Sequence, residues 1–312
     1  MERGVIEAPV EWRQAVETGR LHHAWLITGG AGLGKYEFAQ RAAGQLVEAA
    51  DVRAHPDVDI VRLLPKDEKE EKKRVDGQPF DRKRNITVAQ IRSIQARLNA
   101  RPTLGDKRAV IIEPAEAMER GAANALLKSL EEPPANTFFF LVSHHAARLL
   151  PTIRSRCRQL RFARFDDDSL ETALTEAMPD LDVASHRAAV ANAAGSPAKA
   201  IAFAEHKLAP AAELLDRMLN DGGRGLGAEL AAALGGRPPR EKMAAFFALA
   251  RARLNRDLAQ LNRSALDRRA EVLCELVLLE QEAPVLNYDP GLLVQRVAAL
   301  LARAAPASEQ LR

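Results

Sequence analysis

The hydrophobic pattern of the first 165 residues alternates between two periods. Short, continuous apolar runs such as Thr137–Val142 are typical of strands buried on both faces of a parallel sheet. The stretches between these runs carry an apolar residue every third or fourth position, which predicts helices, and one of them begins with Thr87 as its N-cap. Strands and helices in alternation predict an α/β fold with a doubly wound parallel sheet, whose ligands lie at the carboxyl ends of the strands. The predicted strands are His23–Thr28, Asp57–Leu64, Ala109–Ile112 and Thr137–Val142, and the predicted helices are Lys35–Glu48, Thr87–Ala100 and Ala123–Glu132.

The pattern changes after Phe165, where the strand-like runs end and only helical periodicity remains. Short helices come first and longer ones follow from Ala209 onward, so we expect domain boundaries near residues 165 and 208. The predicted helices of this half are Asp168–Met178, Ala184–Ala194, Pro197–His206, Pro210–Leu219, Leu226–Leu234, Arg240–Leu261, Ser264–Glu282 and Pro290–Ala304.

The balance of charged residues is typical of a globular protein and indicates no strong preference for an acidic or a basic partner. Lys and Arg number 45 and Asp and Glu number 42, and the resulting net charge of +3 permits a nucleic-acid neighbour without arguing for one. The mixed-charge run Lys66–Arg74 predicts a solvated loop, with a nucleic-acid contact as the alternative. Two cysteines form no disulfide framework, and the longest apolar run, Met243–Ala250, is far shorter than the ~18 residues of a membrane span. We therefore expect a soluble, cytoplasmic protein.

The segment Gly29–Tyr36, "GGAGLGKY", matches the phosphate-loop pattern G-x-x-x-x-G-K-[ST] except at its last position. An apolar strand precedes it and a helix begins at Lys35, which points backbone N–H groups and a helix dipole at a phosphate. Gly29, Gly32, Gly34 and Lys35 are therefore candidate nucleotide-binding residues.

Two features predict that this loop no longer supports catalysis. The Ser/Thr hydroxyl of a working loop coordinates Mg²⁺, whereas the Tyr36 hydroxyl lies at the far end of a rigid ring. A working site also needs an acidic pair after a later buried strand, and here Glu113 is followed by Pro114, which cannot orient a water. We expect an inherited loop with lost catalysis, and weak binding of ATP or ADP stays open.

Several segments together resemble the clamp-loader AAA+ ATPases of bacterial replication. They are "HHAWLITGGAGLGK", "AHPDVDIV", "KRAVIIEPAEAM", "NALLKSLEEPP", "FFFLVS", "TIRSRCRQLRF" and "AAGSPAKAIAF", with a looser match at "NYDPGLLVQRVAALLAR". The resemblance implies an AAA+ core at residues 1–165, a three-helix lid at 166–207 and a helical collar that joins subunits into a ring at 208–312.

The same resemblance implies that the nucleotide site is degenerate. Tyr36 and Glu113-Pro114 depart from the family pattern, and Ala198 stands where the lid's sensor arginine belongs, with Lys199 one residue late. Ser143 occupies the place of the first sensor. The family's four-cysteine zinc module is missing from the sequence, so no zinc is expected.

The motif Ser155-Arg156-Cys157 is intact. In the family this arginine points toward the nucleotide of the neighbouring subunit, where a guanidinium stabilises the transferring phosphoryl group. Arg156 is therefore a candidate arginine finger acting in trans, with an ordinary surface arginine as the alternative. Cys157 fits a small buried residue better than a nucleophile.

The resemblance implies that this chain is a non-hydrolysing stator with no catalytic activity of its own. It would be a subunit of a DNA-directed DNA polymerase (nucleotidyltransferase) holoenzyme. The implied partners are gamma/tau and delta subunits in a pentameric ring, and through the complex a sliding clamp and primed DNA; no membrane partner is expected. The alternatives are an active gamma/tau-like ATPase and, from another class, a P-loop kinase for a small molecule.

Overall fold

The computed structural model describes residues 9–221, 225–286 and 288–305. The chain divides into two compact units that meet in the sequence between Phe165 and Asp166, and each is described by itself. The ends of the first and last predicted domains, residues 1–8 and 306–312, lie outside the described residues, as do residues 222–224 and 287.

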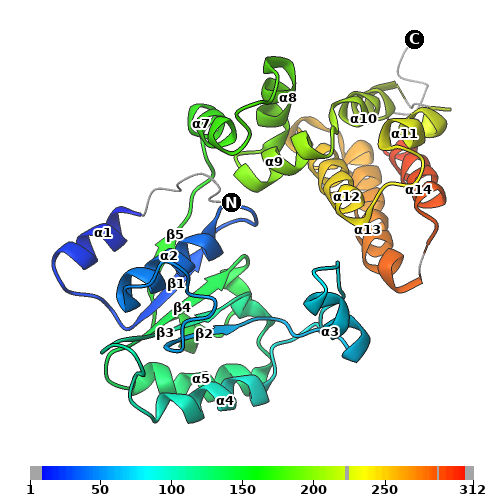
Figure 1. The fold of residues 1–312 in the computed structure, drawn as a ribbon. Helices are drawn as coiled ribbons and strands as arrows, with labels where there is room; N and C mark the ends of the chain where they lie inside the picture. Colours follow the sequence, from blue (N-terminus) through cyan, green and yellow to red (C-terminus); the bar gives the residue numbers. More distant parts are fainter. Residues whose placement is uncertain (1–8, 222–224, 287, 306–312) are drawn as a thin grey trace. The chain divides into compact units, whose positions relative to one another are not determined.

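The first unit contains a sheet of five parallel strands in the order β2-β3-β4-β1-β5 (Figure 1). Pairing places Thr28 beside Ser143 of one neighbouring strand and Arg161 of the other. The carboxyl ends of these strands therefore meet at one edge of the sheet, and the predicted α/β fold is confirmed. The strands are β1 (Ala24–Thr28), β2 (Val58–Val61), β3 (Arg108–Ile112), β4 (Thr137–Ser143) and β5 (Arg158–Arg161).

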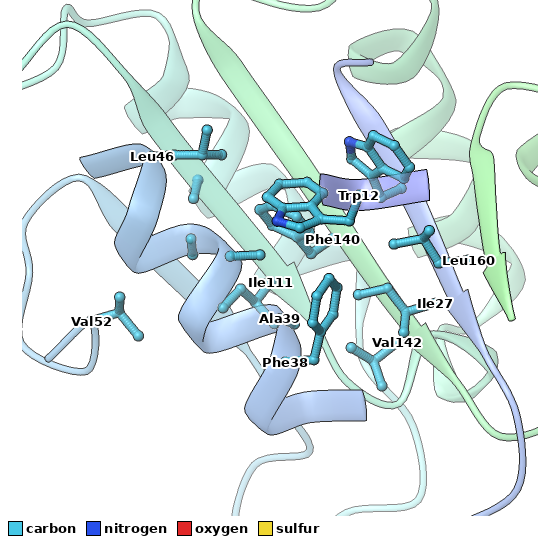
Figure 2. Packing of buried hydrophobic residues seen from close by; sticks show 14 of the residues in the cluster. Trp12, Ile27, Phe38, Ala39, Leu46, Val52, Ile111, Phe140, Val142 and Leu160 are labelled. Atoms are coloured by element: carbon cyan, nitrogen blue, oxygen red, sulfur yellow. The ribbon is translucent and has the colours of Figure 1, made fainter. Parts of the chain in front are cut away.

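Helices cover both faces of the sheet because its central strands are apolar on both sides. On one face, α1 (Val10–Glu17) and α2 (Lys35–Val47) pack over a core in which the Trp12 ring meets Phe140 edge-on, with 5.6 Å between ring centroids (Figure 2). On the other face lie α4 (Val88–Leu98) and α5 (Arg120–Glu131) (Figure 1). The remaining elements of this unit are α3 (Glu68–Val75), α6 (Pro151–Arg154), and the 3-10 turns η1 (Ala115–Ala117) and η2 (Ala146–Arg148).

The segment Lys66–Arg74 was predicted to be a loop, and that prediction is wrong, because most of it lies in helix α3. The Asp67 carboxylate caps the helix by accepting a hydrogen bond from the backbone N–H of Glu70 at 3.0 Å. Lys73 pairs with Glu70 at 2.6 Å, three residues earlier, so the mixed charges stabilise the helix from within.

The second unit is helical throughout its described residues, as predicted. In its long helix α13, the buried stripe consists of Val272, Leu276 and Leu279. The helices are α7 (Asp167–Ala177), α8 (Val183–Ala193), α9 (Pro197–Glu205), α10 (Ala209–Asp221), α11 (Gly227–Leu234), α12 (Arg240–Leu254), α13 (Arg263–Leu286) and α14 (Pro290–Arg303), with the 3-10 turn η3 (Leu258–Gln260). None of the helices in the described ranges combines the length and the apolar character that a membrane crossing requires.

Candidate functional site

The glycine loop connects the end of β1 to the first residue of α2, as the sequence predicted. Three of its glycines have positive φ angles that favour glycine: Gly29 at 141°, Gly32 at 77° and Gly34 at 74°. At Gly29 a side chain is also excluded by space, because a Cβ there would lie 2.5 Å from the carbonyl oxygen of Phe162. The loop therefore depends on glycine for its path between strand and helix.

Lys35 turns back toward this loop. Its ammonium group donates a hydrogen bond to the carbonyl oxygen of Gly30 at 2.5 Å, and only 2% of the residue is exposed. Burial lowers the pKa of Lys35, and the negative charges of Glu116 and Glu113 oppose that effect. A cation is thus held beside the N-terminus of α2, where backbone N–H groups also favour an anion.

The residue after Lys35 has an unforeseen partner. The guanidinium carbon of Arg62 lies 4.5 Å from the centroid of the Tyr36 ring, a cation–π arrangement. Nε of Arg62 also lies 2.7 Å from Oε2 of Glu113, although the N–H direction does not meet hydrogen-bond geometry, so the contact is an ion pair. Burial raises the pKa of Tyr36 and keeps its hydroxyl protonated. Arg62 therefore contacts both Tyr36 and Glu113.

Glu116 forms a second carboxylate position near Lys35. Its Oε1 accepts a hydrogen bond from the backbone N–H of His144 at 2.9 Å. Burial alone would raise the pKa of Glu116, but hydrogen bonds, including those from Ser143 and His144, outweigh it and lower the pKa. Burial and the charge of Lys35 lower the pKa of His144, so the imidazole is neutral at pH 7.

These positions follow from sheet register. Arg62, Glu113 and His144 are the first residues after β2, β3 and β4, and the glycine loop follows β1. The predicted residues Gly29, Gly32, Gly34, Lys35, Tyr36, Glu113 and Ser143 consequently lie at one edge of the sheet.

Sequence reasoning missed Arg62, Glu116 and His144 as members of this site. Arg62 was counted inside a strand predicted to run to Leu64, whereas β2 ends at Val61. The available signal for Arg62 was a charged residue directly after a buried strand, the same feature that distinguishes Glu113. Glu116 is brought back to the sheet edge by the turn η1, which the sequence pattern did not predict.

The residues present do not fit Mg²⁺. A phosphate loop holds the metal between a small hydroxyl at position 36 and a carboxylate at position 113. Here Tyr36 offers an aromatic ring, and the carboxylate of Glu113 is paired with Arg62. Among the residues that the structure describes, no group of three or more His, Cys, Asp or Glu side chains could hold a metal ion.

Arg156 lies at the amino-terminal ends of the strands, at the edge of the sheet opposite the glycine loop. It precedes β5 by two residues, and β5 pairs with β1 from Arg158, opposite Trp25, to Arg161, opposite Thr28. Four residues of strand span about 13 Å, so Arg156 is separated from its own glycine loop by the length of the sheet. Its Nη1 donates to the Thr152 carbonyl oxygen at 2.9 Å.

The other half of the Arg156 guanidinium faces α5. Nη2 of Arg156 lies 2.5 Å from Oε1 of Glu131, and both side chains are partly exposed. Next to it, Cys157 is buried, which raises the pKa of its thiol to about 12. Ala198 and Lys199, which the resemblance assigns to a lid, lie in the first turn of α9, within the second unit.

Comparison with known proteins gives a consistent picture for the first unit. A family model described as DNA polymerase III, delta subunit, matches residues 7–166. The chain is 35% identical over 202 residues to DNA polymerase III subunit delta' of Pseudomonas aeruginosa, covering 60% of this chain and 57% of that protein. The matched region thus spans little more than half of that relative.

A tau subunit and a solved structure are also similar to this chain. The tau subunit of DNA polymerase III from Salmonella typhimurium is 30% identical over 168 residues, covering 53% of this chain and 25% of that protein. A gamma subunit-related protein of DNA polymerase III from Thermotoga maritima has a TM-score of 0.53 at 17% identity, covering 94% of this chain and 99% of that chain. At that identity the structural likeness concerns the fold alone.

Proposed function

Because this chain belongs to the family described as DNA polymerase III, delta subunit, and resembles its delta' members, we propose that it is a clamp-loader stator that hydrolyses no ATP itself. The observation that carries this proposal is the position of Arg62. Its guanidinium contacts both Tyr36 and Glu113, the two positions that would hold the catalytic metal in a working loop.

The active motor of the family is the second candidate, since a tau subunit is also similar in sequence, although over a shorter region and at lower identity than the delta' relative. The residue after Glu113 argues against it. Pro114 has no side-chain donor or acceptor with which to orient an attacking water, so hydrolysis would lack its base as well as its metal.

Arg156 gives the stator an active part in the assembly. We propose that it acts on the nucleotide of a neighbouring gamma/tau subunit, because it is partly exposed and lies at the sheet edge away from its own loop. A ring of five subunits with gamma/tau and delta, acting on a sliding clamp and primed DNA, is the assembly in which such an arginine would have a target.

The second unit would supply the assembly contacts, with residues 166–207 as a lid and 208–312 as a collar. Support comes from helix α13, where two large apolar side chains lie outside the buried stripe. Leu266 is 39% exposed and Leu278 is 56% exposed, so this helix presents apolar side chains that are available to a partner subunit.

Reconstitution tests the proposal. The purified chain is expected to show no ATP hydrolysis above background, and its mixture with gamma/tau and delta subunits should form a defined complex that loads a clamp onto primed DNA. Turnover by the isolated chain that disappears in Lys35→Ala would identify a motor. A chain without residues 208–312 that still entered the complex would exclude the collar assignment.

A further inference from the structure

The candidate nucleotide site consists of one half that matches a working phosphate loop and one half that does not. In the matching half, the glycine φ angles, the N-terminus of α2 and the position of Lys35 form a cradle for a phosphate group. In the other half, the residues at the two metal-holding positions, Tyr36 and Glu113, both contact Arg62. The residues that do not fit Mg²⁺ therefore lie together around one side chain, Arg62.

The guanidinium of Arg62 is suited to replace a metal at this location. It carries a fixed positive charge, and its planar set of N–H donors can engage two phosphate oxygens at once. Nε faces Glu113, and no protein group among the described residues hydrogen-bonds either Nη atom. Two donor groups therefore stay available for an anion while the arginine is held by its carboxylate and by the Tyr36 ring.

The surrounding charges favour the same interpretation. A second guanidinium, Arg82, is close enough to Arg62 for their charges to interact, and it stacks on Phe80 with 5.1 Å between its Cζ and the ring centroid. Arg62 and Arg82 thus place two positive charges near Tyr36 and Glu113. The carboxylates of Glu113 and Glu116 that face them act on Lys35 as well, so they are already compensated within the protein.

We propose that the Arg62 guanidinium takes the place of Mg²⁺ in this site, so that the loop binds the phosphates of a nucleoside diphosphate or triphosphate without a divalent metal. This inference deepens the proposed function, on which it rests in treating the loop as the remnant of a nucleotide site. Mg²⁺ needs free oxygen ligands in near-octahedral geometry, and a guanidinium paired with Glu113 both removes the ligand and repels the ion.

Isothermal titration of the full chain with ADP, in excess Mg²⁺ and separately in excess EDTA, tests this proposal. The wild-type dissociation constants in the two buffers are expected to agree within about two-fold. Arg62→Ala should weaken binding in EDTA by about ten-fold or more, because it removes charged hydrogen bonds to the phosphates. Arg62→Gln, which keeps much of the side-chain volume, should weaken it similarly, and circular dichroism melting checks that both variants fold.

Arg84→Ala is the matched control, since Arg84 is an exposed arginine close in sequence to Arg82, and its affinity for ADP should equal that of the wild type. Absence of ADP binding, loss of binding in EDTA, or unchanged metal-free affinity in folded Arg62→Ala would each overturn the proposal. None of these results touches the stator role, which is judged by assembly and by the absence of hydrolysis.

Discussion

The carboxylate of Glu131 holds the guanidinium of Arg156, with 2.5 Å between Oε1 and Nη2. The contact joins the segment "NALLKSLEEPP" to the segment "SRC". A partly exposed pair of this kind contributes only about 0.2–1 kcal/mol to folding stability. The pair matters for the orientation of Arg156, because Glu131 and the Thr152 carbonyl together fix where the guanidinium points.

Replacing Arg156 should affect a neighbour rather than this chain. Arg156→Ala is expected to leave the fold and the assembly unchanged, while hydrolysis at the motor site facing it falls by about 10³–10⁵-fold, the effect of removing an arginine finger. Arg156→Lys should restore little, because an ammonium cannot bind two oxygens in a plane. Steady-state ATPase of complexes checked by sizing measures this. Wild-type rates in an assembled variant would reduce Arg156 to a surface residue.

Glu131 should act through Arg156 as a positioning residue. Glu131→Gln removes the charge that holds the guanidinium, so we expect a partial loss of ATPase in the assembled complex, smaller than in Arg156→Ala. The double variant should be no worse than Arg156→Ala alone, because the two residues act in one chain of contacts. Glu132→Gln, an exposed neighbour, is the control and should keep the wild-type rate. Additive losses in the double variant would contradict the assignment.

The buried carboxylate of Asp57 should make the folding stability depend on pH in the acidic range. Asp57 is fully buried and accepts hydrogen bonds from the amides of Thr103 at 2.6 Å and Leu104 at 2.8 Å, with Arg108 at 3.5 Å. Burial would raise the pKa of Asp57, but these hydrogen bonds outweigh it and lower the pKa below the usual value.

Because the folded pKa of Asp57 is lowered, its stabilisation is fully present above the unfolded pKa of about 3.9 and is lost as pH falls through the folded pKa. Asp57→Asn should lower the free energy of unfolding at pH 7 by about 3–5 kcal/mol, since it removes the charge that pairs with the buried Arg108 and one acceptor of the two amide hydrogen bonds. Urea unfolding at pH 7 and in steps below pH 4 measures both effects. The exposed Asp106→Asn should change neither; an Asp57→Asn chain of wild-type stability would show that the pair is dispensable.

The two cysteines should differ in reactivity. Burial raises the pKa of Cys157 to about 12, and Cys274 is exposed. Since the thiolate is the reactive form, Ellman's reagent at pH 8 should titrate one thiol rapidly in the native chain and both after denaturation. Cys274→Ser should abolish the rapid phase; its persistence in that variant would place Cys157 at an accessible site.

The parts of the fold that could be predicted are those whose sequence pattern matches burial. Strands β3 and β4 are continuous apolar runs, and Thr87 does cap α4. Strand β5 was missed because "RQLR" is polar, as suits an edge strand with three exposed side chains. Glycines and Lys35 were evident from the loop motif, whereas Glu131 and Arg156 are 25 positions apart and no local pattern indicates that they touch.

The packing around Gly29 limits which substitutions the phosphate loop can accept during evolution. When hydrolysis is no longer under selection, substitutions accumulate wherever they are neutral for folding. Position 29 is not such a place, because a side chain there would collide with the Phe162 backbone, whereas positions 36 and 114 accommodate a tyrosine and a proline. If the loop hydrolyses no ATP, as proposed, selection on folding alone still keeps glycine at position 29. A glycine at this position is therefore found with or without ATP hydrolysis, and does not by itself indicate an ATPase.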